Sequence, residues 1–271
     1  MARVSALHIY PVKSCRGHRL ESAAFDAWGL AGDRRYLIIT PDGQFVTQRQ
    51  LPRLALVDTQ LDSGRLTLGS PGRRSVTLPP SPPAPLAHTV TIWKDQVQAE
   101  DCGDEAAEWL TRFLGAPLRL VRMGPHYHRP VKPSRARPGD VVSFADAYPF
   151  LVISEASLDD LNDRLVARHE EPLPMNRFRP NIVVADCAPY AEDAWIRVRI
   201  GPARFRNSGP CARCVITTTD QLTAERGKEP LRTLASYRRD PRDPADVNFG
   251  VNLIHESPSG ALAVGDRVET A

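Results

Sequence analysis

The sequence is short of several features that would place it in a common class. Its 271 residues include only five cysteines, an odd number that does not favour the disulfide framework of a small secreted fold. No apolar run approaches the ~20 residues that a membrane-spanning helix needs. The stretch from Met1 to Ser5 lacks the charged-then-apolar pattern of a signal peptide. These absences predict a soluble protein in a reducing compartment, which we take to be the cytoplasm.

Motifs for several cofactors and partners are also missing. The sequence has no ferredoxin-type cysteine run, no flavin fingerprint, no haem motif and no internal repeat. Its 35 basic and 32 acidic residues leave a formal charge of +3, so nothing points to a nucleic acid or a membrane as a partner. We expect a local excess of basic residues instead, which is suited to holding a phosphate.

The residues that are present indicate a β-rich fold. A hydrophobic content of 42% is enough for a substantial core, and short strands separated by turn residues recur along the chain. They include predicted strands from Leu54 to Leu61 and from Val141 to Phe144, and His255 lies in a strand pattern that favours a packed residue over a catalytic one. We therefore predict a mainly β protein with several helices (α+β), built around barrels or sandwiches. A basic, proline-broken loop from Gly124 to Gly139 is interpreted as a domain boundary. The predicted domains are residues 1–122 and 123–271.

The most informative stretch runs from Gly209 to Asp220 and reads GPCARCVITTTD. Gly209 and the following proline mark a turn, and the β-branched residues after Cys214 predict a strand. Cys214 is therefore expected where a loop enters a strand. Taken alone, this C-x-x-C pair is compatible with half a zinc site, a redox dithiol, a disulfide or one metal-ligating thiolate.

These alternatives differ in what they require elsewhere in the chain. Zinc usually needs a second C-x-x-C or a histidine pair, and Cys15, Cys102 and Cys187 are scattered with no histidine at ligand spacing. A thioredoxin-like dithiol lies at the start of a helix, whereas this motif is expected to precede a strand. Arg213, between the two cysteines, would favour the thiolate form of Cys214.

Other segments carry side chains suited to an anion or a polar ring. Lysine is a point charge, arginine a planar fork, and serine and asparagine supply further hydrogen bonds. Each of these residues taken singly would pass as solvated surface or packing. The candidates near turns and strand ends are Lys13, Ser14, Arg34, Asp146, Arg177, Arg179 and Asn181.

Several of these segments together resemble the MOSC family. The run YPVKSC from Tyr10, the run RFRPNIVV from Arg177, the CARC motif and the closing VGDRV from Val264 agree with that family in order and spacing. The likeness is strongest to members with an N-terminal β-barrel domain, which include the amidoxime-reducing components. It implies an N-terminal β-barrel-like domain, a MOSC β-barrel domain and a cofactor cleft between them.

The resemblance also implies a cofactor, the molybdenum cofactor (Mo-molybdopterin). In the family, the second cysteine of the motif is the protein ligand of molybdenum, and here that residue is Cys214, the implied metal ligand and catalytic residue. Ala212 stands where relatives carry a hydroxyl, so its contact would come from the backbone. The cofactor-binding residues implied are Lys13, Ser14, Arg34, Asp146, Arg177, Arg179, Asn181, Ala212, Arg213 and Cys214.

The activity implied is the reduction of small N-hydroxylated compounds such as amidoximes, hydroxylamines and N-hydroxy purines. Because the chain lacks other redox-cofactor motifs, the electrons are expected from a separate protein: a ferredoxin, a cytochrome b5-like protein or a flavoprotein reductase. MOSC domains also occur appended to molybdenum-cofactor sulfurases. The alternative is therefore a carrier in which Cys214 holds the cofactor or a persulfide and hands it on.

Overall fold

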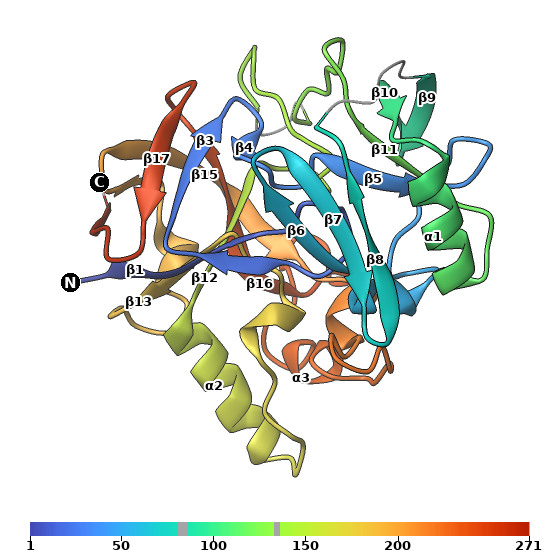
Figure 1. Ribbon diagram of the computed structural model, residues 1–271. Coiled ribbons are helices and arrows are strands. Elements are labelled where there is room, and N and C mark those ends of the chain that lie inside the picture. Colours follow the sequence, from blue (N-terminus) through green and yellow to red (C-terminus); the bar gives the residue numbers. More distant parts are fainter. Residues whose placement is uncertain (81–85, 133–135, 271) are drawn as a thin grey trace.

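The computed structural model describes residues 1–80, 86–132 and 136–270 (Figure 1). Strands dominate it, so the predicted fold class, mainly β with several helices, is confirmed. Part of the loop expected from Gly124 to Gly139, residues 133–135, lies outside the described residues. No helix in the described ranges is both long and apolar enough to cross a membrane.

The largest sheet has eight strands and takes strands from both ends of the sequence. From one edge to the other they are β18 (Val268–Thr270), β14 (Arg197–Ile200), β15 (Ala203–Ala212), β16 (Asn248–His255), β12 (Phe150–Ser154), β13 (Ile182–Ala185), β1 (Arg3–Ile9) and β2 (His18–Leu20). The β12–β13 pair is parallel and the other neighbours are antiparallel.

Three smaller sheets complete the β structure. The four-stranded one contains β5 (Tyr36–Ile39), β11 (Arg119–Met123), β10 (Asp95–Asp101) and β9 (Ala87–Ile92). The three-stranded ones contain β17 (Gly260–Ala263), β3 (Ser22–Asp26) and β4 (Gly29–Leu30), and β6 (Asp58–Asp62), β7 (Arg65–Ser70) and β8 (Arg73–Leu78).

The helices are few and lie around the sheets (Figure 1). Ser154 begins one of them by accepting a hydrogen bond from the Ser157 N–H group, as expected of an N-cap. The α-helices are α1 (Asp104–Leu114), α2 (Glu155–Val166) and α3 (Leu231–Leu234). The 3-10 helices are η1 (Pro52–Leu56), η2 (Met175–Arg177), η3 (Ala191–Ala194) and η4 (Val215–Thr218).

The two halves of the sequence are interlocked by strand pairing. Strand β1 lies between β2 and β13, and β3 pairs with β17 near the end of the chain. In β1 and β13, Leu7 is paired with Ile182 in antiparallel register. The residues that follow β1 and those that precede β13 therefore emerge at the same edge of the large sheet.

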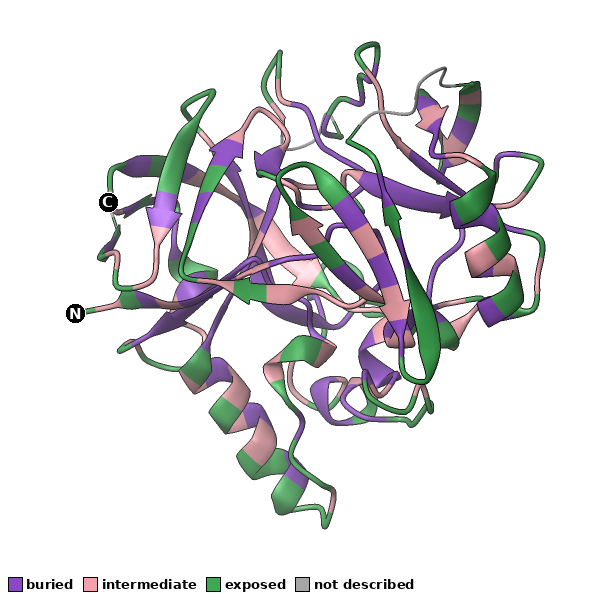
Figure 2. Ribbon diagram, in the orientation of Figure 1, coloured by how far each residue is buried: buried purple, intermediate pink, exposed green. Residues whose placement is uncertain are grey.

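An aromatic cluster fills the core beside the large sheet, where the strands are mostly buried (Figure 2). The rings of Phe150 and Phe205 meet edge to face at 5.2 Å between centroids, and Phe25 lies 5.9 Å from each. His255, expected to be packed rather than catalytic, has its ring against Phe25 and Phe150. Because Phe25 comes from the N-terminal half, this cluster joins the two halves.

The strand expected after Cys214 is wrong. Residues Val215–Thr218 form the 3-10 helix η4, whereas the preceding strand β15 continues to Ala212. The turn predicted at Gly209 is therefore part of that strand. The hydroxyl of Thr217 donates to the Cys214 carbonyl at 2.9 Å, and that of Thr218 donates to the Val215 carbonyl at 2.8 Å. These local bonds occupy carbonyls that a strand ladder would use, so tertiary context overrides the β propensity.

Two further strand expectations need correction. The stretch expected as one strand from Leu54 to Leu61 divides into η1, which begins at Pro52, and β6. Proline suits the first turn of a helix because its missing N–H would have no partner there. Residues Val141 to Phe144 make only an isolated bridge between Val141 and Pro130, while the N–H of Phe144 donates to the Arg34 carbonyl.

Truncation of Phe205 should test the aromatic core. Phe205 is fully buried, and a Phe→Ala change in a core costs about 3–5 kcal/mol of unfolding free energy because it leaves a cavity. We expect Phe205→Ala to lose that amount in urea-induced unfolding. Ile196→Ala is the control, since Ile196 is 77% exposed and surface changes usually stay within about 0.5 kcal/mol. Equal effects of the two variants would contradict the assigned packing.

Candidate functional site

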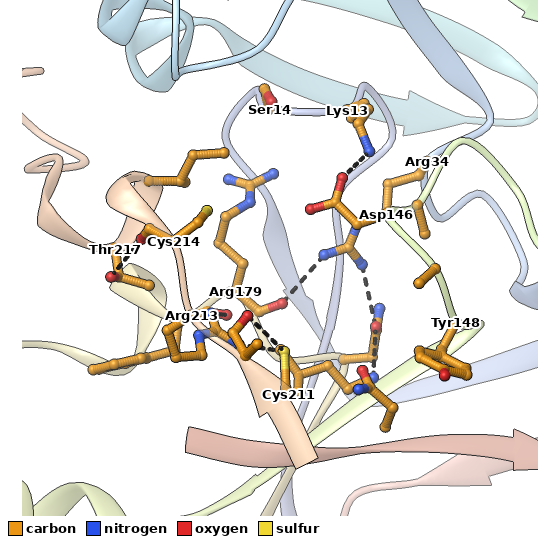
Figure 3. Close-up of a pocket in the computed structure, with 18 of the residues that line it drawn as sticks. Lys13, Ser14, Arg34, Asp146, Tyr148, Arg179, Cys211, Arg213, Cys214 and Thr217 are labelled. Carbon is orange, nitrogen blue, oxygen red and sulfur yellow. Dashed lines mark hydrogen bonds and ion pairs between the residues drawn. The ribbon is translucent and has the colours of Figure 1, made fainter. Parts of the chain in front are cut away.

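A cavity of about 500 Å³ lies between the two halves of the chain (Figure 3). Nine of the ten cofactor-binding residues predicted from the sequence line it. They are Lys13, Ser14, Arg34, Asp146, Arg179, Asn181, Ala212, Arg213 and Cys214. Strand register explains much of this convergence. Lys13 and Ser14 follow β1, Arg179 and Asn181 precede β13, and Asp146 precedes β12, which runs parallel to β13.

Lys13 and Asp146 form the ion pair that links the halves at the cavity wall. The Lys13 Nζ donates to Asp146 Oδ1 at 2.5 Å and to the Phe144 carbonyl at 2.7 Å. Burial lowers the pKa of Lys13 to about 8, and the charge of Asp146 opposes that shift. Burial would raise the pKa of Asp146, but the charges of Lys13 and Arg49 outweigh it and hold this pKa well below its usual range.

Arg34 and Arg179 share the ring of Tyr10. Their guanidinium carbons lie 4.4 Å and 4.2 Å from its centroid, within the distance at which an aromatic face attracts a cation. Arg34 also donates to Asp33 at 2.7 Å, to Asn181 Oδ1 at 3.1 Å and to the Arg179 carbonyl at 3.2 Å. Two arginines from opposite halves of the chain are thereby held side by side.

The backbone is strained at three of these positions. Ser14, Arg34 and Arg179 have φ angles of 68°, 48° and 57°, in the left-handed region that non-glycine residues rarely adopt. Such conformations cost about 1–3 kcal/mol each and cluster at functional sites. Their occurrence on one cavity wall supports a binding role for this wall.

The two cysteines of the motif have different surroundings. Arg213, expected to act on Cys214, instead donates from Nη1 to Cys211 Sγ at 2.9 Å and from Nη2 to the Phe178 carbonyl at 2.6 Å. Burial raises the pKa of the Cys211 thiol, and Arg213 opposes this shift. The Cys214 sulfur receives its hydrogen bond from Arg49 Nη2 at 3.2 Å.

Several buried guanidinium N–H groups along the cavity have no acceptor in the described part of the chain. They are Nη2 of Arg179, Nη1 of Arg49 and Nε of Arg213. A buried donor without a partner costs about 1–3 kcal/mol, and more when it is charged. Burial lowers the pKa of Arg179 to about 10, so this group remains positive at neutral pH. The cavity is suited to an anionic ligand that accepts several hydrogen bonds.

Arg177 is the predicted residue that the structure does not bring to the cavity. Its Nη2 donates to Asp220 at 3.0 Å, and the pair lines a separate groove with Glu170 and Lys228. Arg177 ends η2, and Pro180 follows it before β13 begins, so Arg177 and Arg179 diverge. Asn181 lines the cavity, yet its amide nitrogen donates to the His8 carbonyl and its oxygen accepts from Arg34 and from Leu151.

Sequence reasoning missed Arg49 and the role of Tyr10. Arg49 lies in a loop, in the run Thr47-Gln48-Arg49-Gln50, and nothing in that run marks it. Tyr10 carries no signal in the sequence beyond its place in the YPVKSC run, whereas its ring contacts the guanidinium groups of both Arg34 and Arg179. A tyrosine directly before a strand-ending proline is a weak signal, and only the three-dimensional neighbours give it meaning.

The five cysteines are not joined in disulfide bonds. All five cysteines are free thiols, and the described residues contain no group of three or more His, Cys, Asp or Glu side chains arranged to hold a metal ion. Cys214 lies at the cavity wall and begins η4, whose Thr217 N–H donates to the Cys214 carbonyl at 3.1 Å. Hydrogen bonds to its own carbonyl therefore fix the backbone that carries the Cys214 sulfur.

Comparison with known proteins gives matches along almost the whole chain. The model of the MOSC N-terminal beta barrel domain matches residues 1–117, and that of the MOSC domain matches residues 118–269. The chain is 40% identical to mitochondrial amidoxime-reducing component 1 of Homo sapiens, over 98% of this chain and 82% of that protein. It is 37% identical to that of Danio rerio (98% and 83%) and 38% identical to mitochondrial amidoxime reducing component 2 of Bos taurus (98% and 82%).

The ion pair of Lys13 predicts an unusual titration. Because burial lowers its pKa to about 8 from the ordinary 10.5, the folded protein releases this proton at lower pH than the unfolded chain. The cost of burying the ammonium is therefore full below pH 8 and is relieved as the pH rises from 8 to 10.5. With only four lysines in the chain, ¹³Cε-lysine NMR should resolve a midpoint near 8.

Asp146→Asn tests the cause of that shift. It removes the negative charge that raises the pKa of Lys13, so the midpoint should fall below that of the wild type. The other three lysine signals serve as internal references. A Lys13 midpoint near 10.5, or one unchanged by Asp146→Asn, would be incompatible with a buried Lys13 ammonium paired with Asp146.

Proposed function

The chain belongs to the MOSC family, in the group of the amidoxime-reducing components, and we propose that it is a molybdenum-cofactor-dependent reductase of N-hydroxylated compounds. The observation that carries the proposal is the cavity. There a cysteine sulfur meets guanidinium N–H groups from both halves that have no acceptor within residues 1–80, 86–132 and 136–270. Amidoximes, hydroxylamines and N-hydroxy purines are the proposed substrates.

The residues present fit the molybdenum cofactor. A molybdopterin carries a phosphate and a polar ring system, and the buried N–H groups of Arg179, Arg49 and Arg213 supply donors for such a ligand. Cys214 would bind the metal as a thiolate, the soft donor that suits a redox-active transition metal. Lys13 and Ser14 would hold the cofactor from the N-terminal half, opposite the motif.

The chemistry consists of a two-electron reduction. An amidoxime, R–C(NH₂)=N–OH, takes up two electrons and two protons, its N–O bond breaks, and the amidine and one water leave. The cofactor, when bound, supplies the two-electron redox couple. The protein would bind and orient the cofactor. It would also keep cationic groups near the substrate oxygen, on which negative charge builds up as the N–O bond breaks.

Asp146 has a supporting part in this scheme. Its carboxylate is ionised at neutral pH because Lys13 and Arg49 hold its pKa down, so it accepts hydrogen bonds and does not deliver a proton. It keeps the ammonium of Lys13 fixed at 2.5 Å. Ala212, which has no side-chain donor, would contribute through its backbone.

The electrons would come from a separate protein. A ferredoxin, a cytochrome b5-like protein or a flavoprotein reductase is the proposed donor, as the sequence led us to expect. The relatives cited above are named as mitochondrial, and the cytoplasmic location expected for this chain stays a prediction. A reducing compartment agrees with the five free thiols.

Exchange of the two cysteines one at a time should separate their roles. Cys214→Ala is expected to remove the metal ligand and to abolish reduction of benzamidoxime to benzamidine by the loaded protein. Cys211→Ala is the matched control and should keep the activity. Cys211 also lines the cavity, but among the described residues its sulfur is hydrogen-bonded to Arg213 and the Ala212 carbonyl. Activity is measured with a chemical reductant, and molybdenum by elemental analysis.

The same wild-type and variant proteins also test the alternative, a carrier of the cofactor or of sulfur. Wild-type protein that holds molybdenum, forms no more benzamidine than Cys214→Ala, and passes sulfur from a Cys214 persulfide to an apo-molybdoenzyme would be a carrier. Mass spectrometry detects the persulfide. Zinc in place of molybdenum would contradict both functions.

Two arginines that lie two residues apart offer a test of the cofactor cradle. Arg179→Met removes a buried donor facing the cavity, and hydrogen bonds to charged groups contribute about 1.5–3 kcal/mol, so cofactor affinity should fall about 10-fold or more. Arg177→Met removes the pair with Asp220 outside the cavity and should leave affinity close to that of the wild type. Titration of cofactor-free protein with molybdopterin, followed by fluorescence, measures both. A larger loss in Arg177→Met would refute this assignment.

A further inference from the structure

Arg49 donates a hydrogen bond directly to the Cys214 sulfur. Its Nη2 lies 3.2 Å from Cys214 Sγ and 3.5 Å from Asp146 Oδ2. The distance to sulfur is within the range of an N–H···S hydrogen bond. Arg49 comes from the N-terminal half and the other two from the C-terminal half.

A pair of glutamines, here called the Gln48–Gln221 latch, links the two halves of the chain and holds the backbone next to Arg49. Gln48 and Gln221 are buried and exchange two amide hydrogen bonds of 3.1 Å each. Gln48 also donates to the Ser14 carbonyl at 2.7 Å, and Arg226 donates to the carbonyls of Gln48 and Arg49. The backbone at Arg49 is thus tied both to the N-terminal cavity wall and to the loop after η4.

An aromatic ring supports the guanidinium of Arg49. The Arg49 guanidinium carbon lies 4.7 Å from the centroid of Trp93, and Phe45 packs edge to face on Trp93 at 5.1 Å. Trp93 has a φ of 57°, a strained conformation for a large side chain. Stacking on an indole orients the planar fork of arginine, which aims its N–H groups.

Asp146 forms its closer ion pair with Lys13 and not with Arg49. Lys13 contacts that carboxylate at 2.5 Å, a full ångström closer than Arg49 does. Asp146 is therefore paired first with Lys13, and the positive charge of Arg49 remains available to the sulfur. Hydrogen bonds to ligand sulfurs and charges around them tune the reduction potential of a metal centre, because they stabilise its electron-rich state.

We propose that Arg49 is a positioning residue for the metal ligand: it fixes the Cys214 sulfur and limits how strongly that sulfur donates to the metal. The part that concerns the metal rests on the function proposed above. The N–H···S hydrogen bond does not, because it stands in the protein alone. Trp93 and the Gln48–Gln221 latch act through Arg49.

The test compares three variants of the loaded protein. Arg49→Met removes the charge and the donor, and Arg49→Lys keeps the charge without the fork. Arg53→Met is the matched control, since Arg53 lies over the Phe113 ring and does not line the cavity. The readouts are the midpoint potential of the molybdenum centre and the EPR spectrum of its one-electron-reduced form. We expect a more negative potential and an altered spectrum in Arg49→Met, an intermediate shift in Arg49→Lys and none in Arg53→Met.

Loaded protein of Arg49→Met or Arg49→Lys whose potential and spectrum match the wild type would overturn the role at the metal. If Arg49→Met purifies without molybdenum, Arg49→Lys carries this measurement. A merely structural role would lower the urea midpoint of unfolding and leave the potential unchanged.

A second readout needs no cofactor. In a double-mutant cycle of Arg49→Met and Cys214→Ala, unfolding of the cofactor-free proteins in urea should show coupling, with the double variant destabilised less than the sum of the single ones. Strict additivity would overturn the hydrogen bond itself. If wild-type protein holds no molybdenum under any loading condition, the proposed function fails, and this cycle alone decides whether Arg49 positions the sulfur.

Discussion

The gathering of like charges in one cavity is the constraint on which the site depends. Buried cations repel one another and lose hydration, so each must find compensation within the protein. Lys13 has a carboxylate and a carbonyl, and Arg34 has a carboxylate, an amide oxygen and a carbonyl. Arg179 shares the Tyr10 ring and keeps a buried N–H that has no acceptor among the described residues. This incomplete compensation gives the cavity its preference for an anion.

The interlocked sheets make such a cavity possible. A cleft between two separate domains would open under the repulsion of its own walls, unless a ligand held it closed. Here strand β1 is part of the sheet that carries β13, and Phe25 packs against Phe150 and Phe205. The residues after β1 and before β13 are therefore fixed by backbone pairing before any ligand binds, and less ordering entropy is lost on binding.

Much of this was predictable where chemistry and spacing are local. Short stretches of sequence are enough to predict the CARC motif, the basic residues at the ends of strands and the mainly β class. Arg49 does not, because its place depends on a glutamine pair that joins positions 48 and 221. The prediction for Arg177 was wrong for a local reason: the short helix η2 and Pro180 turn its side chain away from that of Arg179. The division after residue 122 stays a prediction, and strands β1 and β3 cross it by pairing with later strands.

The choice of arginine over lysine at this site follows from the same electrostatics. Burial brings the pKa of Lys13 to about 8 even beside Asp146, so a buried lysine without such a partner would risk losing its charge. Arg179 is buried and makes no ion pair with a carboxylate in the part of the chain that the structure describes, yet it keeps a pKa of about 10. Guanidinium groups also stack on Tyr10 and Trp93, which an ammonium does less specifically. A permanently cationic cavity therefore has to be built mainly from arginine, with aromatic rings as its supports.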